Sequence, residues 1–167
     1  MTAAAQAIPA GISGLCAAVT TGFLLSRLQP SLIMCVALLA FCVGNILVAT
    51  QPISQSYWIQ TFLSFVVTPW GMDMSFPAAT LILSDSVSKE HQGIAASLVT
   101  TIVNYSISIG LGIAGTVEVH VNHDNQDMLR GFRGAWYAGI GLSGLGVIVS
   151  ILFIFSERGL KQQISKG

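Results

Sequence analysis

Five long apolar stretches, separated by short polar segments, make up most of this chain. They cover residues 4–25, 31–49, 57–84, 92–117 and 134–155. A bilayer core of about 30 Å is crossed by about 20 apolar residues in a helix, and each stretch reaches that length. The pattern predicts an all-α, polytopic membrane protein with five transmembrane helices in a single membrane domain over residues 1–167.

The composition supports this prediction. Hydrophobic residues make up 53% of the chain and charged residues only 8%, whereas soluble domains contain about 25% charged residues. The first stretch is too long for a typical signal-peptide core and has no basic residue before it, so we interpret it as a spanning helix. A net charge of zero gives no reason to expect a nucleic-acid partner.

The basic residues are distributed unevenly between the two ends of the predicted helices. If the helices alternate in direction, one side carries Arg130 and Arg133, and the other carries Arg27, Lys89, Arg158, Lys161 and Lys166. Cytoplasmic connectors carry the excess of Lys and Arg in membrane proteins. The sequence therefore predicts a cytoplasmic C-terminus and an N-terminus on the opposite side of the membrane.

Asp73 is the only charged residue inside any of the five stretches, and it lies near the middle of the third. A carboxylate at this depth is costly, which makes it a candidate for ion or substrate handling. It can exchange a proton or contact a substrate. The alternative is structural, with Asp73 bonding to backbone freed by Pro77 or to Asn104 or Gln60.

The third stretch also contains Pro69, Gly71 and Pro77. Each proline removes a backbone donor, so we expect a kink or a loosened helix around residues 70–73. The fourth stretch carries hydroxyl and amide side chains followed by Gly110, Gly112 and Gly115. Small and polar residues on a membrane helix indicate close helix packing or a cavity wall, and a GxGxxG pattern inside such a helix does not predict nucleotide binding.

Two other groups of residues have structural interpretations. Cys16, Cys35 and Cys42 lie in apolar stretches without CxxC spacing, so neither a disulfide nor a metal site is expected. The polar segment at 118–133 contains four residues whose spacing could suit a metal ion: His120, His123, Asp124 and Asp127. We interpret this segment as a solvated loop and not as a metal site. With neither HExxH nor GxSxG present, we expect no enzyme and no cofactor.

Four segments resemble one known family. They are residues 22–27 (GFLLSR), 70–78 (WGMDMSFPA), 92–97 (QGIAAS) and 104–110 (NYSISIG). Together they resemble the C-terminal part of a major facilitator superfamily transporter, and are most similar to fungal multidrug:proton antiporters with fourteen spans. The resemblance implies that the five helices are the last five of the transporter core, a C-terminal half that lacks its first helix.

The resemblance implies a function in proton-coupled export of small hydrophobic or amphipathic compounds, as a fragment of a larger transporter in the plasma membrane rather than an internal one. Asp73 would handle the proton or the substrate, with Asn104, Gln60 and Asn45 as polar cavity-wall residues. The expected partners are membrane lipid, a small-molecule substrate, protons, and the missing N-terminal half or a full-length relative. The alternative is a truncated, non-transporting membrane protein that is inactive or modulates a full-length relative.

Gly22 and Arg27 have two interpretations. Arg27 can simply be a topology-setting charge at a helix end. The resemblance instead implies conformational gating, in which Gly22 lets another helix approach closely and Arg27 pairs across the cytoplasmic face. Ser26 stands where the family's connector motif has an acidic residue.

Overall fold

The computed structural model describes residues 3–52, 58–122 and 128–164, and this part of the chain is helical throughout apart from its connectors. The elements in order are α1 (Ala3–Leu25), α2 (Pro30–Ala49), α3 (Gln60–Asp85), the short 3₁₀ helix η1 (Lys89–His91), α4 (Gln92–Val121) and α5 (Met128–Ile164). The architecture is an all-helical membrane bundle, as the apolar pattern predicts.

The helices at the C-terminal end are longer than the apolar stretches that predict them. α4 continues to Val121, and α5 starts at Met128 and runs to Ile164, so both ends of the predicted loop at 118–133 are helical. A helix satisfies its backbone hydrogen bonds internally and can therefore extend beyond the apolar layer. Hydropathy marks the membrane boundary and not the helix end. The residues at 53–57 lie outside the described part of the chain, so the predicted start of the third helix at Tyr57 is not described.

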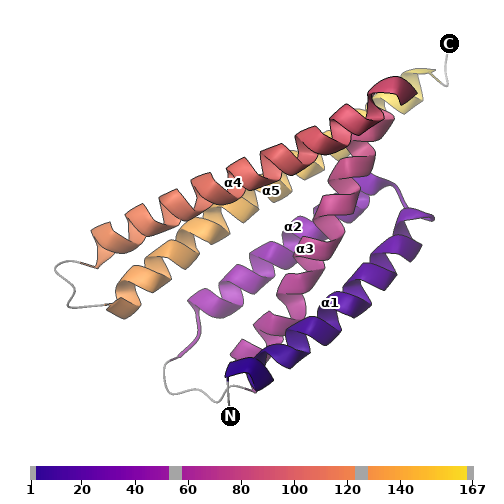
Figure 1. Cartoon of the computed structure of the whole chain (residues 1–167). Helices are drawn as coiled ribbons and strands as arrows, with labels where there is room; N and C mark the ends of the chain where they lie inside the picture. The colour runs from indigo at the N-terminus through magenta and orange to yellow at the C-terminus, as the bar shows by residue number, and fades with distance from the viewer. Residues whose placement is uncertain (1–2, 53–57, 123–127, 165–167) are drawn as a thin grey trace.

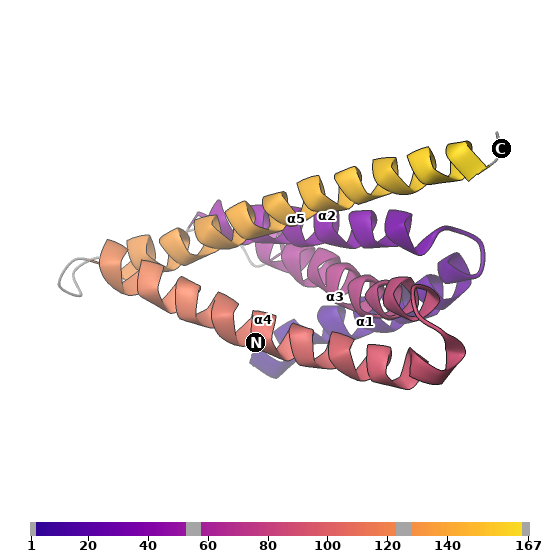
Figure 2. The same cartoon turned by 90° about the horizontal axis from the view of Figure 1, so that it is seen from above.

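α3 is the central helix of the bundle and packs against α1, α2 and α4. α5 packs against α2 and α4 (Figures 1 and 2). A buried hydrophobic cluster lies where α2 crosses α3 and contains Ile33, Ala37, Met74 and Ala78. Small residues permit this crossing, because a Cβ at Gly71 would lie 2.9 Å from the ring of Phe41.

Four of the described helical segments are long and apolar enough to cross a membrane: Ala7–Leu25, Pro30–Ala49, Lys89–Val121 and Met128–Gly159. The remaining long helix, α3, is long enough but carries Asp73 and several hydroxyl residues, which lower its hydropathy. A helix that is largely covered by other helices does not need an apolar surface all round. The contacts of α3 with three other helices therefore account for part of its polar content.

Candidate functional site

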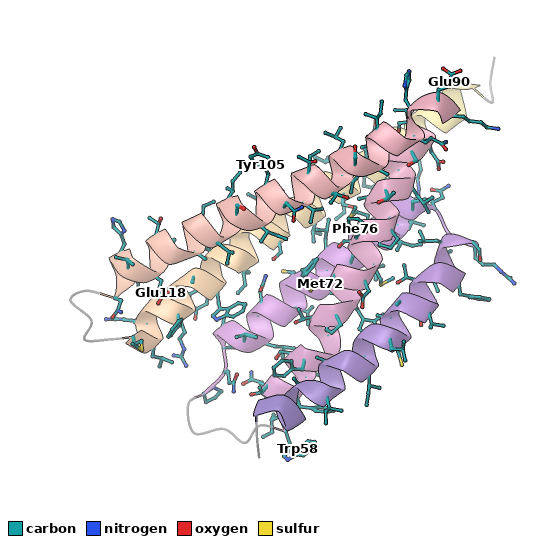
Figure 3. The ribbon with its side chains drawn as sticks, in the orientation of Figure 1. Trp58, Met72, Phe76, Glu90, Tyr105 and Glu118 are labelled. Carbon is teal, nitrogen blue, oxygen red and sulfur yellow. The ribbon has the colours of Figure 1, made fainter. Side chains whose placement is uncertain are left out.

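The predicted acidic residue lies beside a pocket between α1 and α3. Asp73 is half-buried, and the pocket has a volume of about 340 Å³. Figure 3 shows the neighbouring Met72 and Phe76 along the middle of α3. The residues that line the pocket are Ala10 and Gly14 of α1, and Phe65, Thr68, Pro69, Met72 and Asp73 of α3.

The backbone of α1 forms the wall next to the carboxylate. A Cβ at Gly14 would lie 3.2 Å from Oδ2 of Asp73 and 3.7 Å from Cβ of Pro69. A larger residue at position 14 would therefore occupy the space in front of the carboxylate. Gly14 has a role in the site that the sequence pattern does not indicate, because α1 contains several glycines with nothing to distinguish them.

Ser13, the residue before Gly14, connects α1 to the proline-containing part of α3. Pro69 has no N–H to donate to the carbonyl of Phe65, which leaves α3 short of a backbone bond at this turn. Next to it, the hydroxyl of Ser13 donates to Val66 O at 2.6 Å, and the indole N–H of Trp70 donates to Ser13 Oγ at 3.1 Å. Ser13 itself is buried, and both bonds are part-buried.

These bonds bear on the predicted kink. α3 is one continuous helix from Gln60 to Asp85, with both Pro69 and Pro77 inside it. Pro77 removes the helical donor to the carbonyl of Asp73 itself, just as Pro69 does to that of Phe65. Gly71 serves close packing against α2, and the predicted role of these three residues as a kink stays a prediction.

The other predicted polar residues lie elsewhere in the bundle. Gln60, at the start of α3, donates through Nε2 to Thr50 Oγ1 at 3.3 Å. Asn45 lies between α2 and α5, where a Cβ at Gly139 would be 3.4 Å from its Nδ2. Asn104 is exposed on α4. Of the four residues predicted for proton or substrate handling, only Asp73 lines this pocket.

Gly22 lies in the last turn of α1, and Arg27 follows the end of this helix. Gly22 is exposed, and a Cβ there would meet nothing within 4 Å in the described part of the chain. The guanidinium of Arg27 is 5.3 Å from the centroid of the Phe23 ring, a cation–π contact within its own helix end. Their gating role stays a prediction.

The pocket combines one carboxylate with an apolar and aromatic lining. Such a surface can accept the apolar body of a small molecule, while the carboxylate can accept a hydrogen bond, a proton or a cation. Among the described residues there is no group of three His, Cys, Asp or Glu that could hold a metal ion. His123, Asp124 and Asp127 lie outside the described residues.

Comparisons with known proteins agree with this architecture. An uncharacterised MFS-type transporter of Schizosaccharomyces pombe is 67% identical over 92% of this chain and 30% of its own length. The low affinity ammonium transporter of Saccharomyces cerevisiae is 62% identical over 93% of the chain and 30% of its own length. The efflux pump terJ of Aspergillus terreus is 51% identical over 91% of the chain and 29% of its own length.

The chain thus spans about 30% of the length of these relatives. No solved structure matches it. The model of the Major Facilitator Superfamily matches residues 2–167, nearly the whole chain. With its helical membrane architecture and its close relatives among transporters, the chain belongs to the Major Facilitator Superfamily.

Proposed function

We propose that this chain forms part of a proton-coupled exporter of small hydrophobic or amphipathic compounds. Asp73 carries the proton or contacts the substrate in the pocket between α1 and α3. The observation that supports this most directly is the position of Asp73, a half-buried carboxylate midway along a membrane helix. The pocket beside it has an otherwise apolar or aromatic lining apart from Thr68. Ionisable residues in such positions belong to substrate and ion pathways in membrane proteins.

The relatives support transport of small molecules. One is named as an efflux pump and another as a low affinity ammonium transporter. One name states a direction and the other states a substrate, so together they support a transporter without selecting a compound. The apolar lining of the Asp73 pocket favours compounds that partition into the bilayer over a small, strongly hydrated ion.

The exposed face of α4 supports assembly with a further membrane segment. Ser97, Thr101, Asn104 and Ser108 recur every three to four residues and are all exposed. Such spacing places them on one face of a helix. A polar face on a membrane helix meets protein or a water-filled cavity in preference to lipid. We therefore place Asn104 on the wall of a cavity that the remainder of the transporter closes.

Alternating access in this fold requires two halves that move around a site at the membrane midplane. The transporting unit is therefore an assembly in which α1, α3 and α4 face the remainder of the fold, supplied by a longer polypeptide or by a second chain. In this proposal the assembly lies in the plasma membrane, and the end of α5 near Ile164 is in the cytoplasm.

The test is Asp73→Asn in the assembled transporter that contains this chain, reconstituted in vesicles with an internal pH dye. Asn keeps the size of Asp and most of its hydrogen bonds but cannot exchange a proton, so substrate-driven proton movement should fall by about tenfold or more. Asp85→Asn is the matched control, because Asp85 is exposed at the end of the same helix. Vesicles with this chain alone should show no substrate-driven proton movement.

Normal proton movement in Asp73→Asn, at normal protein levels in the vesicles, would show that Asp73 is structural. Loss of proton movement together with unchanged substrate export would show that the carboxylate couples transport to protons without holding the substrate.

A further inference from the structure

A second pocket lies between α2 and α5, on helices that do not line the Asp73 pocket. Its volume is about 240 Å³. It sits where α2 ends and α5 begins, the end of the bundle at which Figure 3 labels Glu118. Six of the residues that line it combine one cation with an amide and four apolar or aromatic side chains: Arg133, Gln51, Val48, Leu129, Phe132 and Trp136.

Arg133 is held in place by a chain of hydrogen bonds. Its Nη2 donates to Gln51 O at 3.0 Å, and Gln51 Nε2 donates to Thr61 Oγ1 at 2.5 Å. These bonds connect the beginning of α5, the end of α2 and the beginning of α3. A guanidinium has five N–H donors, and the bond to Gln51 uses one of them. The group is planar and its shape matches the geometry of a phosphate.

The charges near Arg133 in the described part of the chain favour an anion. Arg130 precedes Arg133 by three residues and is exposed, and residues three apart on a helix lie on one face. Among the described residues, the acidic Glu118 of α4 packs against Gly131 at this end of α5. Gly131 and Arg133 are separated by about 200° around the helix, so Glu118 meets a different face of α5.

The sequence around the pocket is typical of the depth of lipid headgroups. Arg133 immediately precedes the apolar run 134–155, and Trp136 lies within the first turn of that run. Phe132 is 47% exposed and Trp136 is 40% exposed. Amphipathic aromatic rings prefer the boundary between headgroups and acyl chains. A basic group with exposed aromatic rings at this boundary presents one polar and one apolar surface side by side.

We propose that this pocket binds a glycerophospholipid. The lipid phosphate pairs with the guanidinium of Arg133, and the glycerol and the upper part of an acyl chain lie against Phe132, Trp136 and Val48. The bound lipid holds the ends of α2 and α5 together at the membrane surface. This role is independent of Asp73 and of what the transporter carries.

The test is native mass spectrometry of the full 167-residue chain released from detergent micelles that contain added phosphatidylglycerol. Arg133→Gln removes the positive charge and the planar guanidinium with its paired N–H donors. It should lower the occupancy of the first lipid adduct by about fivefold. Because Arg133 also holds Gln51, a second variant, Val48→Phe, fills the pocket and leaves the arginine in place, and it should lower occupancy similarly. Arg158→Gln, an exposed charge near the other end of the same helix, should leave occupancy unchanged.

Inorganic phosphate separates a lipid from a free anion. Millimolar phosphate should neither appear as an adduct nor displace the lipid, because it lacks the acyl chain that contacts the aromatic rings. Equal lipid occupancy in the wild type and in Val48→Phe would overturn the proposal. So would displacement of the lipid by inorganic phosphate, which would assign the pocket to a free anion.

Discussion

Gly14 on α1 lies so close to Asp73 on α3 that a Cβ at position 14 would be 3.2 Å from Oδ2 of the carboxylate. The wall in front of this carboxylate is therefore helix backbone. The absence of a side chain at position 14 leaves the pocket open next to the only charged residue in the middle of α3.

Gly14→Val should shield Asp73 from small reagents. A hydrophobic carbodiimide reacts with protonated carboxyl groups inside membranes, and the valine side chain would occupy the space that it needs. We expect labelling of Asp73 in the 167-residue chain to fall by about fivefold or more, because overpacking against Asp73 and Pro69 closes the pocket. Peptide mass spectrometry measures the labelled fraction.

Gly11→Val is the matched control for this labelling. Gly11 is on the same helix, is exposed, and a Cβ there meets nothing within 4 Å in the described part of the chain. Its labelling should equal that of the wild type. Equal labelling of Gly14→Val and Gly11→Val would contradict the pocket geometry.

Ser13→Ala should destabilise the contact between α1 and α3. It removes the donor to Val66 O and the acceptor for the Trp70 indole, both in a buried position. We expect a loss of about 0.5–2 kcal/mol in the free energy of unfolding, measured by denaturant titration in detergent. Trp70→Phe removes only one of the two bonds, so the double variant should show less than additive loss.

Ser75→Ala tests whether any serine on these helices would give the same effect. Ser75 Oγ donates to Met72 O within its own helix, so its removal breaks no contact between helices. A loss for Ser75→Ala equal to that for Ser13→Ala would argue against a specific role for the Ser13 bonds.

Gly71→Ala should destabilise the packing of α2 on α3 by about 1–3 kcal/mol, because its Cβ would meet the Phe41 ring at 2.9 Å. Gly11→Ala should instead be neutral or stabilise by up to about 1 kcal/mol, since Ala favours the helix. The same denaturant titration measures both. Adding Phe41→Leu to Gly71→Ala should restore part of the lost free energy of unfolding. If Phe41→Leu restores none of it, the new methyl group does not clash with the Phe41 ring.

The charge asymmetry along the chain predicts its topology. A reporter fused after Gly167 should be cytoplasmic, and one inserted between α4 and α5 should be on the opposite side. The reason is that Arg27, Lys89 and the basic tail fall on one side if the five helices alternate in direction. Protease protection in sealed membranes reads both positions. Finding both reporters on the same side would contradict the five-span arrangement.

The sequence alone predicts the helical membrane architecture. Stretches such as residues 31–49 and 92–117 are apolar for the length of a bilayer, and no soluble fold can bury them. Proline at position 30 starts α2, where its fixed backbone angle suits the first turn of a helix. The sequence alone also identifies Asp73 as a candidate site residue, because a lone carboxylate in an apolar run is unfavourable without a specific environment.

Which residues surround Asp73 is decided only by the tertiary structure. Asn104, Gln60 and Asn45 have suitable chemistry, but the packing of α3 against three other helices directs them to different places. Ser13 and Gly14 have little chemical signal of their own and become important because α1 crosses α3 at that point. Hydropathy indicates where each residue lies along the membrane normal. Contact between helices depends instead on how each helix is rotated about its axis and where it crosses its neighbours. Small residues and buried hydrogen bonds together determine that rotation and crossing.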